Sequence, residues 1–460
     1  MGNEKLLREG SVARLLISLS LPVILVMLVN VIYNMADVFF LGQTGNTLQV
    51  AAVSLAGPLF GVISALNTLL GFGACTAASI SLGEGDNLSI RRYSSFCLYT
   101  SLLLGGSIAI LIRILMNPVL TLLGANTETA GFASSYLRIL SIGAPFMVAA
   151  GSLGNLYRAD GECKGALISS LLGTIVNIVL DPLFISLLGW GVEGAAWATV
   201  AGNICSFGLI LFAIRKKNKF SLSIRDYSLK KEVSIRIFSL GIPMAAGTLL
   251  MSFSGIFSNR ILVSHGNSTV AASAVAGKAG MLIGMLLMGI CIGIQPAISY
   301  AFGQKNIRRM NEIVRKTTLI VAVIGGLLGC LLILIREQFI CVFLDDPGIL
   351  KIAKLMVIGG VVSAPVSAVN QMCQTFLQST GQVRYATLTA LLQKGIIYIP
   401  VLFGMHMIFG LNGYIWSGLI TDILATAAGI VLCVHSGIYT TKSREHLLSA
   451  PDSDGYLITS

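Results

Sequence analysis

Charged residues are scarce in this chain of 460 residues and make up only 11% of it. A soluble globular domain carries about 25% charged residues, so the composition excludes an ordinary water-soluble fold. Histidine is also rare, with four residues, His265, His406, His435 and His446, scattered along the second half. Because catalysis needs convergent nucleophile–base or metal-ligand groups, these scattered residues predict a protein that is not an enzyme.

Cysteine spacing typical of metal sites is missing as well. The nine cysteines show no Cys-x-x-Cys pattern, and most lie inside apolar segments. We therefore expect small buried apolar residues rather than disulfides or zinc ligands.

Long apolar segments fill most of the chain. Hydrophobic residues make up 55% of the sequence, and the mean hydropathy is +0.84. A membrane-spanning helix needs about 20 apolar residues, so the chain has room for about twelve spans joined by short loops. The predicted spans are 13–40, 50–80, 93–116, 132–157, 165–188, 193–214, 234–263, 269–302, 313–335, 352–377, 385–408 and 412–436.

The two halves of the chain resemble each other at a spacing of about 220 residues. Gly83 corresponds to Gly303, and Pro145 corresponds to Pro365. Internal repeats are usual in secondary transporters, where each repeat supplies half of the transport path. Each half holds six spans, an even number, so the halves share one orientation about a pseudo-twofold axis along the membrane normal.

The predicted fold is therefore an all-α integral membrane protein with about twelve transmembrane helices in two pseudo-twofold-related six-helix bundles. The boundaries follow from the repeat and from the charges. We expect a first bundle at 1–214, a basic cytoplasmic linker at 215–233, a second bundle at 234–438 and a polar cytoplasmic tail at 439–460.

Lysine and arginine residues gather in alternate loops. The chain has 31 of them against 20 acidic residues, and the segment 215–236 is the richest. Both termini fall on the side of these basic loops, so the positive-inside rule predicts that both are cytoplasmic. Nucleic-acid binding is not expected, because the basic residues are spread over many short loops without interleaved aromatics. We expect a multi-pass cell-membrane protein that acts as a monomer.

Two acidic residues, Asp37 and Asp181, lie inside predicted spans. Each costs about 2.5–3.5 kcal/mol on insertion scales and therefore needs a reason. Asn177 precedes Asp181 by four residues on the same helix face, and Thr199 lies at a similar depth in the next span. Oxygen ligands suit Na⁺, and a buried carboxylate can relay a proton. A water-facing acid or an interhelical hydrogen bond would be the structural alternatives.

The candidate cation-coupling residues, with Na⁺ as the candidate metal, are Asp37, Asn177, Asp181 and Thr199. Three more polar residues lie about one helical turn from Asp37 or Thr199 and belong to the same site or border it: Tyr33, Asn34 and Asn203.

The second half holds a different pair of charges. Lys394 and Asp422 each lie about ten residues inside a predicted span, at a depth of roughly 15 Å. We expect the two to pair, either as a structural contact or as a functional one. Lys278 lies close enough to the outer end of its span to compete for Asp422.

A methionine face in the same half is a candidate for the wall of a substrate cavity. Met281, Met285 and Met288 fall at positions i, i+4 and i+7 of one span, with Gln295 further along. Methionine surfaces suit adaptable binding sites, although core packing explains such a face too.

Several segments together resemble the multidrug and toxic compound extrusion (MATE) family, and their order and spacing cover about 10–440. They are "YNMADVFFLG" at 33–42, "NIVLDP" at 177–182, "GIQPAISYAFGQ" at 293–304, and the paired turns "RADGECKGA" and "QSTGQVRYA". The resemblance implies twelve helices in two bundles that form a V. It also implies the export of organic compounds against Na⁺ or H⁺ entry.

The resemblance implies roles for single residues. Asp37 matches the acid of the family's first helix, Asn177 and Asp181 match the pair on its fifth, and Thr199 matches the hydroxyl on its sixth. Spans 7 and 10 carry no acids, which resembles the DinF-like branch and places the ion site in the first half.

Two transport functions fit these observations. The first is a Na⁺- or H⁺-coupled antiporter in the lipid bilayer that exports organic, amphipathic or cationic drug-like compounds. It needs no cofactor besides the coupling ion. The second is a flippase for a lipid-linked substrate, which would favour a more cationic central cavity and often extra spans.

Overall fold

The computed structural model describes residues 3–43, 46–343 and 347–437, and that part of the chain contains no β-strand. The first half forms α1 (Asn3–Glu9), α2 (Val12–Leu15), η1 (Leu16–Ser20), α3 (Leu21–Gly42), α4 (Thr47–Leu55), α5 (Gly57–Glu84), α6 (Asn87–Ile114), α7 (Met116–Leu122), α8 (Ala130–Tyr157), η2 (Arg158–Asp160), α9 (Lys164–Asp181), η3 (Pro182–Leu187), α10 (Gly191–Arg215) and η4 (Ile224–Asp226). The second half forms α11 (Lys231–Ser264), α12 (Asn267–Gly303), α13 (Ile307–Leu334), α14 (Arg336–Cys341), α15 (Pro347–Val362), α16 (Ala364–Ser379), α17 (Val383–Leu391), η5 (Leu392–Ile396) and α18 (Tyr398–His435).

Eleven helical segments within the described residues are long and apolar enough to cross a membrane. The last of them, Val383–His435, has 53 residues and covers two predicted spans. Gly410 interrupts it with a φ of 57° and a ψ of −134°, a conformation that residues with a Cβ adopt only under strain. Three residues later, Gly413 packs directly on the backbone carbonyl of Met405. The predicted all-helical membrane fold with twelve spans is therefore confirmed.

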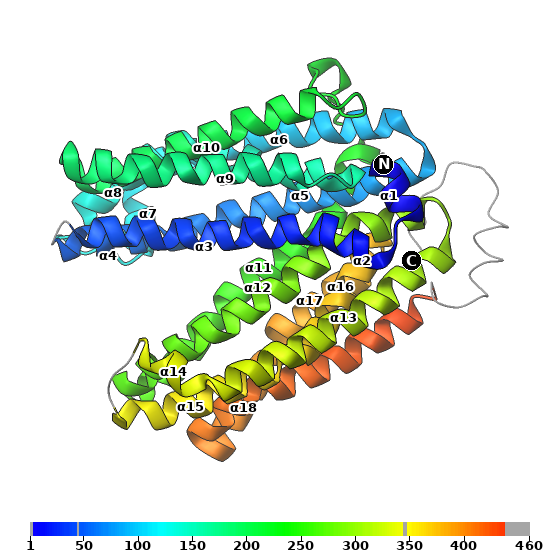
Figure 1. Ribbon diagram of the computed structural model, residues 1–460. Helices are drawn as coiled ribbons and strands as arrows, with labels where there is room; N and C mark the ends of the chain where they lie inside the picture. Colours follow the sequence, from blue (N-terminus) through cyan, green and yellow to red (C-terminus); the bar gives the residue numbers. More distant parts are fainter. Residues whose placement is uncertain (1–2, 44–45, 344–346, 438–460) are drawn as a thin grey trace.

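Figure 1 shows the spans in two groups. The first group contains α3 to α10, and the second contains α11 to α18. The groups meet at the end where the N-terminal helix α1 lies and diverge toward the opposite end, so that together they form a V.

Turn conformations recur between the two halves at the spacing of the sequence repeat. Gly85 has a φ of 81°, and Lys305, its counterpart 220 positions later, has a φ of 56°. The next residues, Asp86 and Asn306, each cap a helix by accepting a backbone N–H bond of 3.0 Å from three residues further on. An Asp or Asn side chain suits this capping position, so both halves begin their third span in the same way.

Glycines line the contact where the two groups meet. Helix α5 of the first group packs on α11 and α12 of the second. A Cβ built on Gly83 would lie 2.3 Å from the Tyr300 carbonyl oxygen, and one on Gly303 would lie 2.1 Å from the Ile80 carbonyl oxygen. Two turns or more along α5, Gly73 approaches the backbone of the second group equally closely. Backbone therefore touches backbone at the vertex of the V.

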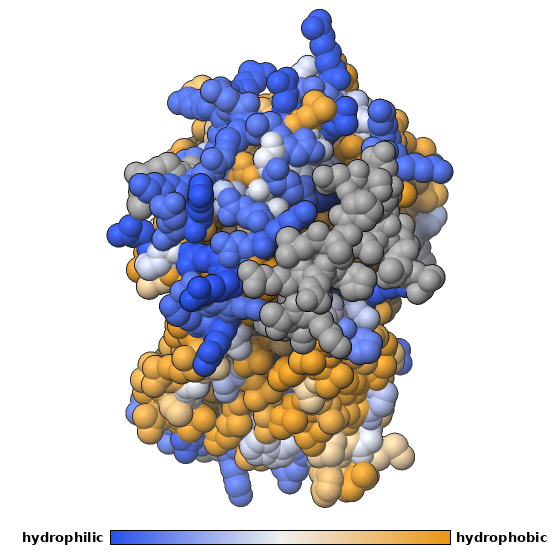
Figure 2. Space-filling view, turned by 90° about the vertical axis from the view of Figure 1, so that its right-hand side faces the viewer, coloured by the Kyte–Doolittle hydropathy of each residue, from blue (hydrophilic) through white to orange (hydrophobic). Residues whose placement is uncertain are grey.

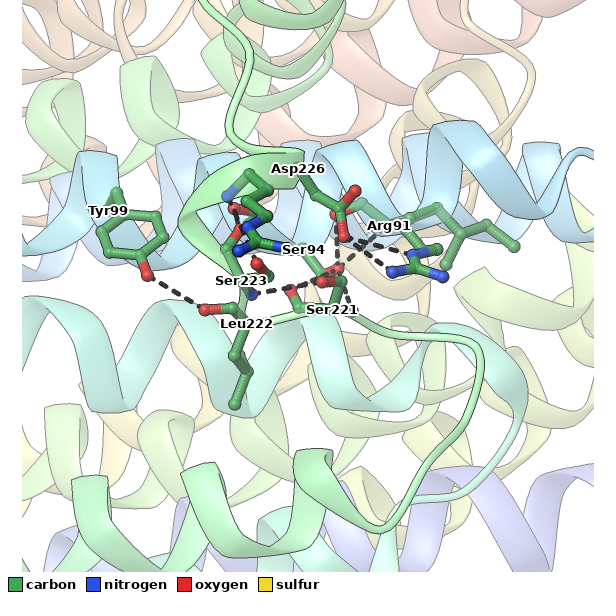
Figure 3. Close-up of polar contacts among 10 residues, drawn as sticks. Arg91, Ser94, Tyr99, Ser221, Leu222, Ser223 and Asp226 are labelled. Atoms are coloured by element: carbon green, nitrogen blue, oxygen red, sulfur yellow. Dashed lines mark hydrogen bonds and ion pairs between the residues drawn. The ribbon is translucent and has the colours of Figure 1, made fainter.

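The linker between the halves is docked on the first group (Figure 3). The Ser221 backbone N–H donates to the Ser94 hydroxyl at 2.9 Å. The Arg91 guanidinium donates to the Asp226 carboxylate at 3.0 Å. Both anchoring residues belong to α6, so the linker up to Asp226 lies against the first group before α11 begins.

Hydrophilic and hydrophobic side chains lie on different parts of the surface, as expected of a membrane protein. Figure 2 views the end at which the groups meet and shows hydrophilic side chains over the first group, with a hydrophobic surface below on the second. Apolar side chains on α13 are largely exposed, including Leu319 at 66%, Leu327 at 66% and Leu334 at 76%. A row of exposed leucines along one helix face is expected where lipid, and not water, is the solvent.

Candidate ion and substrate sites

A buried stripe of small and polar residues runs along α9. Ser169, Gly173, Asn177 and Asp181 follow at intervals of four residues and are all buried. Leucine, isoleucine and valine occupy the exposed side of the same helix. This spacing places the stripe on one face, so the amphipathic pattern of α9 is inverted, with its polar face turned into the protein.

Helices α9 and α10 approach closely at this stripe. A Cβ on Gly173 would lie 2.7 Å from the Gly202 carbonyl oxygen, and one on Gly202 would lie 3.0 Å from the Asn177 Cβ. Thr199, one turn before Gly202 on α10, is fully buried. Asn203 donates a hydrogen bond of 2.8 Å to the Thr199 carbonyl oxygen. The structure thus places Asn177 at the contact of these two helices, with the buried Asp181 one turn further along α9 and the buried Thr199 one turn from Gly202 along α10.

The donor set at this interface fits a hard cation. The Asn177 amide is 1% exposed, and neither its oxygen nor its nitrogen has a hydrogen-bond partner in the part of the chain that the structure describes. A buried polar group without a partner is costly. An amide oxygen, a carboxylate and a hydroxyl are the oxygen ligands that hard cations prefer. The side chains of Tyr33, Asn34 and Asp37 lie outside the described residues, although their backbone belongs to α3.

A cavity of about 410 Å³ lies between the two groups of helices. Its walls come from α3, α5, α8, α9 and α10 of the first group and from α11 and α12 of the second. Asn203 lines it and so links the cavity to the buried α9–α10 interface. A volume of this size suits a small organic molecule, since ligand pockets measure about 300–1,000 Å³.

Of the four residues predicted to form the cavity wall, one lines the cavity and three do not. Met288 lines the cavity. Met281 is 53% exposed, and neither it nor the half-buried Met285 is among the lining residues. Gln295 is buried outside the cavity, where its amide donates to the Thr76 hydroxyl at 2.8 Å and joins α12 to α5.

Other residues of the cavity were missed by sequence reasoning. Three methionines, Met27, Met147 and Met244, come from three different helices and meet only in the folded chain. Arg158 stands in the sequence as one more basic loop residue, yet it is 6% exposed and lines the cavity. Helical periodicity finds residues on one face of one helix, so it does not find a wall assembled from several.

Lys394 and Asp422 both line a second cavity of about 300 Å³ within the second group. The Gln393 amide donates to the Asp422 carboxylate at 2.9 Å and to the Ser367 hydroxyl at 3.2 Å. Among the described residues, no ion pair within 4.0 Å joins Lys394 to Asp422. Nor does an ion pair join Lys278 to Asp422 among these residues; the Lys278 ammonium lies 4.4 Å from the centre of the Phe343 ring.

A duplicated all-helical membrane fold with a cavity between its two groups of spans is the usual architecture of a secondary transporter. The MatE family profile matches residues 22–183 and 243–403, one copy in each half. The chain belongs to the multidrug and toxic compound extrusion (MATE) family, whose members are transporters and not enzymes. It is accordingly a multi-pass protein of the cell membrane.

Several known proteins are similar over nearly the whole chain. Multidrug export protein MepA of Staphylococcus saprophyticus is 31% identical over 425 residues, which cover 92% of this chain and 94% of that protein. MepA of Staphylococcus aureus is 30% identical over the same shares.

Solved structures show the same fold. A multidrug resistance MATE family transporter of the MOP superfamily in an outward-facing conformation has a TM-score of 0.89 at 24% identity, covering 95% of this chain and 99% of that one. A MOP superfamily transporter from Pyrococcus furiosus has a TM-score of 0.87 at 24% identity, covering 96% and 99%.

Proposed function

We propose that this transporter exports organic, amphipathic or cationic drug-like compounds in exchange for Na⁺ or H⁺ by alternating access. The observation that carries the proposal is the position of Asn203, which lines the central cavity and bonds to Thr199 beside the buried Asn177 and Asp181. A ligand in the cavity and an ion at the α9–α10 interface would therefore be neighbours. The names of the MepA relatives support the drug-like class of substrate.

The coupling follows from differential affinity. An ion drives a conformational change only when it binds one state more tightly than the other. Helices α9 and α10 approach each other closely at Gly173 and Gly202, so a small shift of one helix alters the distance between Asp181 and Thr199. We propose that ion binding favours the spacing of one state and that substrate binding favours the other.

The proposed orientation places both termini in the cytoplasm. The basic loops support it through the positive-inside rule. The V opens at the end opposite α1 (Figure 1), so in this orientation the structure faces outward. The cavity then opens to the external medium, as it does in an exporter that is releasing its substrate.

Dye efflux from energised proteoliposomes tests the function. A Na⁺ gradient and a pH gradient are imposed separately, and the gradient that accelerates efflux identifies the ion. Asp181→Asn should abolish the acceleration and leave dye binding in place, because it removes the charge and keeps the shape. Asn177→Leu should do the same by removing an oxygen ligand.

Glu128→Gln serves as the matched control, because Glu128 is an exposed acid in the loop before α8. It should transport like the unmodified protein. Gradient-driven efflux that persists at full rate in Asp181→Asn would remove this residue from the coupling site. Absence of driven efflux for every dye in the unmodified protein would overturn the antiporter itself.

A further inference from the structure

The central cavity has a charged residue in its wall. Arg158 follows the last turn of α8 and is 6% exposed. Its guanidinium donates to the Asn155 amide oxygen at 2.5 Å and lies 5.4 Å from the centre of the Phe72 ring. Both neighbours also line the cavity. The guanidinium thus lies over the Phe72 ring in the wall of the cavity.

No carboxylate of the described residues lies within 4.0 Å of the Arg158 guanidinium. Asp160, two residues further on, bonds to Lys217 at 2.6 Å instead. Among the described residues that line the cavity, Arg158 is the only one of the Asp, Glu, Lys and Arg types. A charge in a membrane-embedded site is expensive and usually marks a ligand or an ion path, and here the charge has no acidic partner in the wall.

Two asparagines that line the cavity pack between α5 and α8. Asn67 of α5 lies on Gly151 of α8, where a Cβ would come within 2.5 Å of the Asn67 amide nitrogen. The reciprocal contact lies one turn further on: Asn155 of α8 packs on Gly71 of α5, where a Cβ would come within 2.8 Å of the Asn155 amide nitrogen. The glycines make room for both amides, and the Asn67 amide oxygen is buried without a hydrogen-bond partner in the described structure.

The sequence repeat shows that the fold itself does not need this charge. The position 220 residues after Arg158 is Gln378, which belongs to the matching turn of the second half. Gln378 is 2% exposed, and its amide donates to the Leu240 carbonyl oxygen at 2.8 Å. The same turn is therefore built with a neutral side chain that is satisfied by backbone, whereas Arg158 has its charge at the cavity.

We propose that Arg158, with Asn155 beside it, binds the anionic group of a transported amphipathic molecule, in the first place a carboxylate. An arginine fork matches the two oxygens of a carboxylate, and bonds between charged partners are about twice as strong as neutral ones. The Asn155 amide nitrogen offers a further donor beside the guanidinium, since the Asn155 oxygen already accepts from Arg158. The methionines of the wall then contact the apolar part of the molecule.

This assignment rests on the proposed export function and names a chemical class within it. Molecules that carry a carboxylate, zwitterions among them, should bind better than analogues in which the carboxylate is masked. A lipid phosphate has related chemistry, so the experiment must distinguish a soluble molecule from a lipid head group.

Binding is measured by fluorescence polarisation with the full-length protein in nanodiscs of neutral lipid and with no ion gradient. The probes are a rhodamine with a free carboxyl group and its methyl ester, which differ only at that group. The unmodified protein should bind the acid more tightly. Arg158→Gln should weaken binding of the acid by about tenfold or more and change binding of the ester by less than about twofold.

Two further variants separate charge from folding. Arg158→Lys keeps the charge and should retain part of the preference for the acid. Asn155→Asp is nearly isosteric and gives Arg158 an internal carboxylate, so it should abolish the preference as Arg158→Gln does. Arg138→Gln, which removes an exposed arginine of α8, is the control and should bind both probes normally.

Equal affinity of the unmodified protein for acid and ester would overturn the assignment, as would an Asn155→Asp protein that still prefers the acid. If phosphatidylglycerol in the nanodiscs displaces both probes equally and the acid has no advantage, the occupant is a lipid head group and the proposal for a soluble substrate is wrong. Because no gradient is used, failure of coupled efflux would not change these results. The two proposals are therefore tested separately.

Discussion

Single glycines decide how closely the two halves of the transporter approach. At Gly83 and Gly303 the helix backbones touch, and a Cβ on either would overlap a carbonyl oxygen of the other group. Overpacking a close contact forces shifts that cost about 1–3 kcal/mol. The pair also recurs at the repeat spacing, so the contact is contributed equally by both halves.

Gly83→Val should therefore push the two groups apart at the vertex of the V. We expect a loss of stability of about 1–3 kcal/mol and a larger loss of transport, because the added methyl groups oppose the contact about which the halves would move. Thermal unfolding in detergent and dye efflux from proteoliposomes measure the two effects. Gly106→Val is the matched control, since a Cβ there has nothing within 4 Å; equal behaviour of both variants would contradict the prediction.

At the scale of the residue, sequence reasoning found the polar side chains that lie inside apolar spans. Asn177, Asp181 and Thr199 were identifiable because polar residues inside apolar spans are expensive, and the structure buries all three on the packed helices α9 and α10. Arg158 was not identifiable in this way. It sits among loop residues, and only the folded chain shows that its loop is buried against the cavity.

At the scale of the element, the linker between the two halves is bound to α6 by an ion pair between Asp226 and Arg91 that depends on pH. Hydrogen bonds from the Ser221 hydroxyl and from the Arg91 guanidinium hold the pKa of the Asp226 carboxyl below its usual value. A carboxyl whose pKa is lowered in the folded state stabilises the fold above its ordinary pKa of about 3.9, and this contribution disappears as the pH falls through the lowered value.

Asp226→Asn should accordingly lower the unfolding temperature at pH 7, and the difference should shrink as the pH falls below about 3.9. Arg91 is 51% exposed, so solvent screening limits the contribution to about 0.5–1 kcal/mol. Scanning fluorimetry of both proteins between pH 3 and pH 7 measures the difference. A gap in unfolding temperature that is the same at every pH would show that the Asp226 charge is not involved.

Element boundaries were predictable wherever a long apolar run lay between polar loops. The predicted 93–116 and 132–157 spans match α6 and the main part of α8. The π-helical turn η5 was not foreseen, although it carries Gln393 and Lys394. Periodicity treats a span as one regular helix, so it does not reveal a local change of helix type. The DinF-like branch and the single ion site remain predictions.

At the scale of the whole molecule, the two halves meet at one end and lie apart at the other (Figure 1). The sequence predicted this arrangement through its repeat and through the resemblance to the MATE family. It did not predict which residues would fill the space between the halves, because those contacts join spans that are distant along the chain.

Alternating access predicts that the separated ends approach each other in a second state. Leu122, at the end of α7, is 87% exposed, and Met407, close to the turn at Gly410, is 84% exposed. Spin labels at these two positions, with the exposed Cys330 and Cys341 replaced by serine, report the opening by double electron–electron resonance. A shorter distance should appear or grow when the coupling ion or the substrate is changed. A single distribution under every condition would contradict alternating access.

The bare backbone contact at Gly83 and Gly303 has a mechanical consequence. Both residues lie at the C-terminal ends of their helices, and backbone contact with the second group continues along α5 as far as Gly73. Helix α5 begins at Gly57, so the part of it before Gly73 is about 24 Å long. A rigid rotation of about 10° around Gly73 would move the far end of this part by about 4 Å. Helix α5 therefore acts as a rigid arm that is held over its C-terminal part.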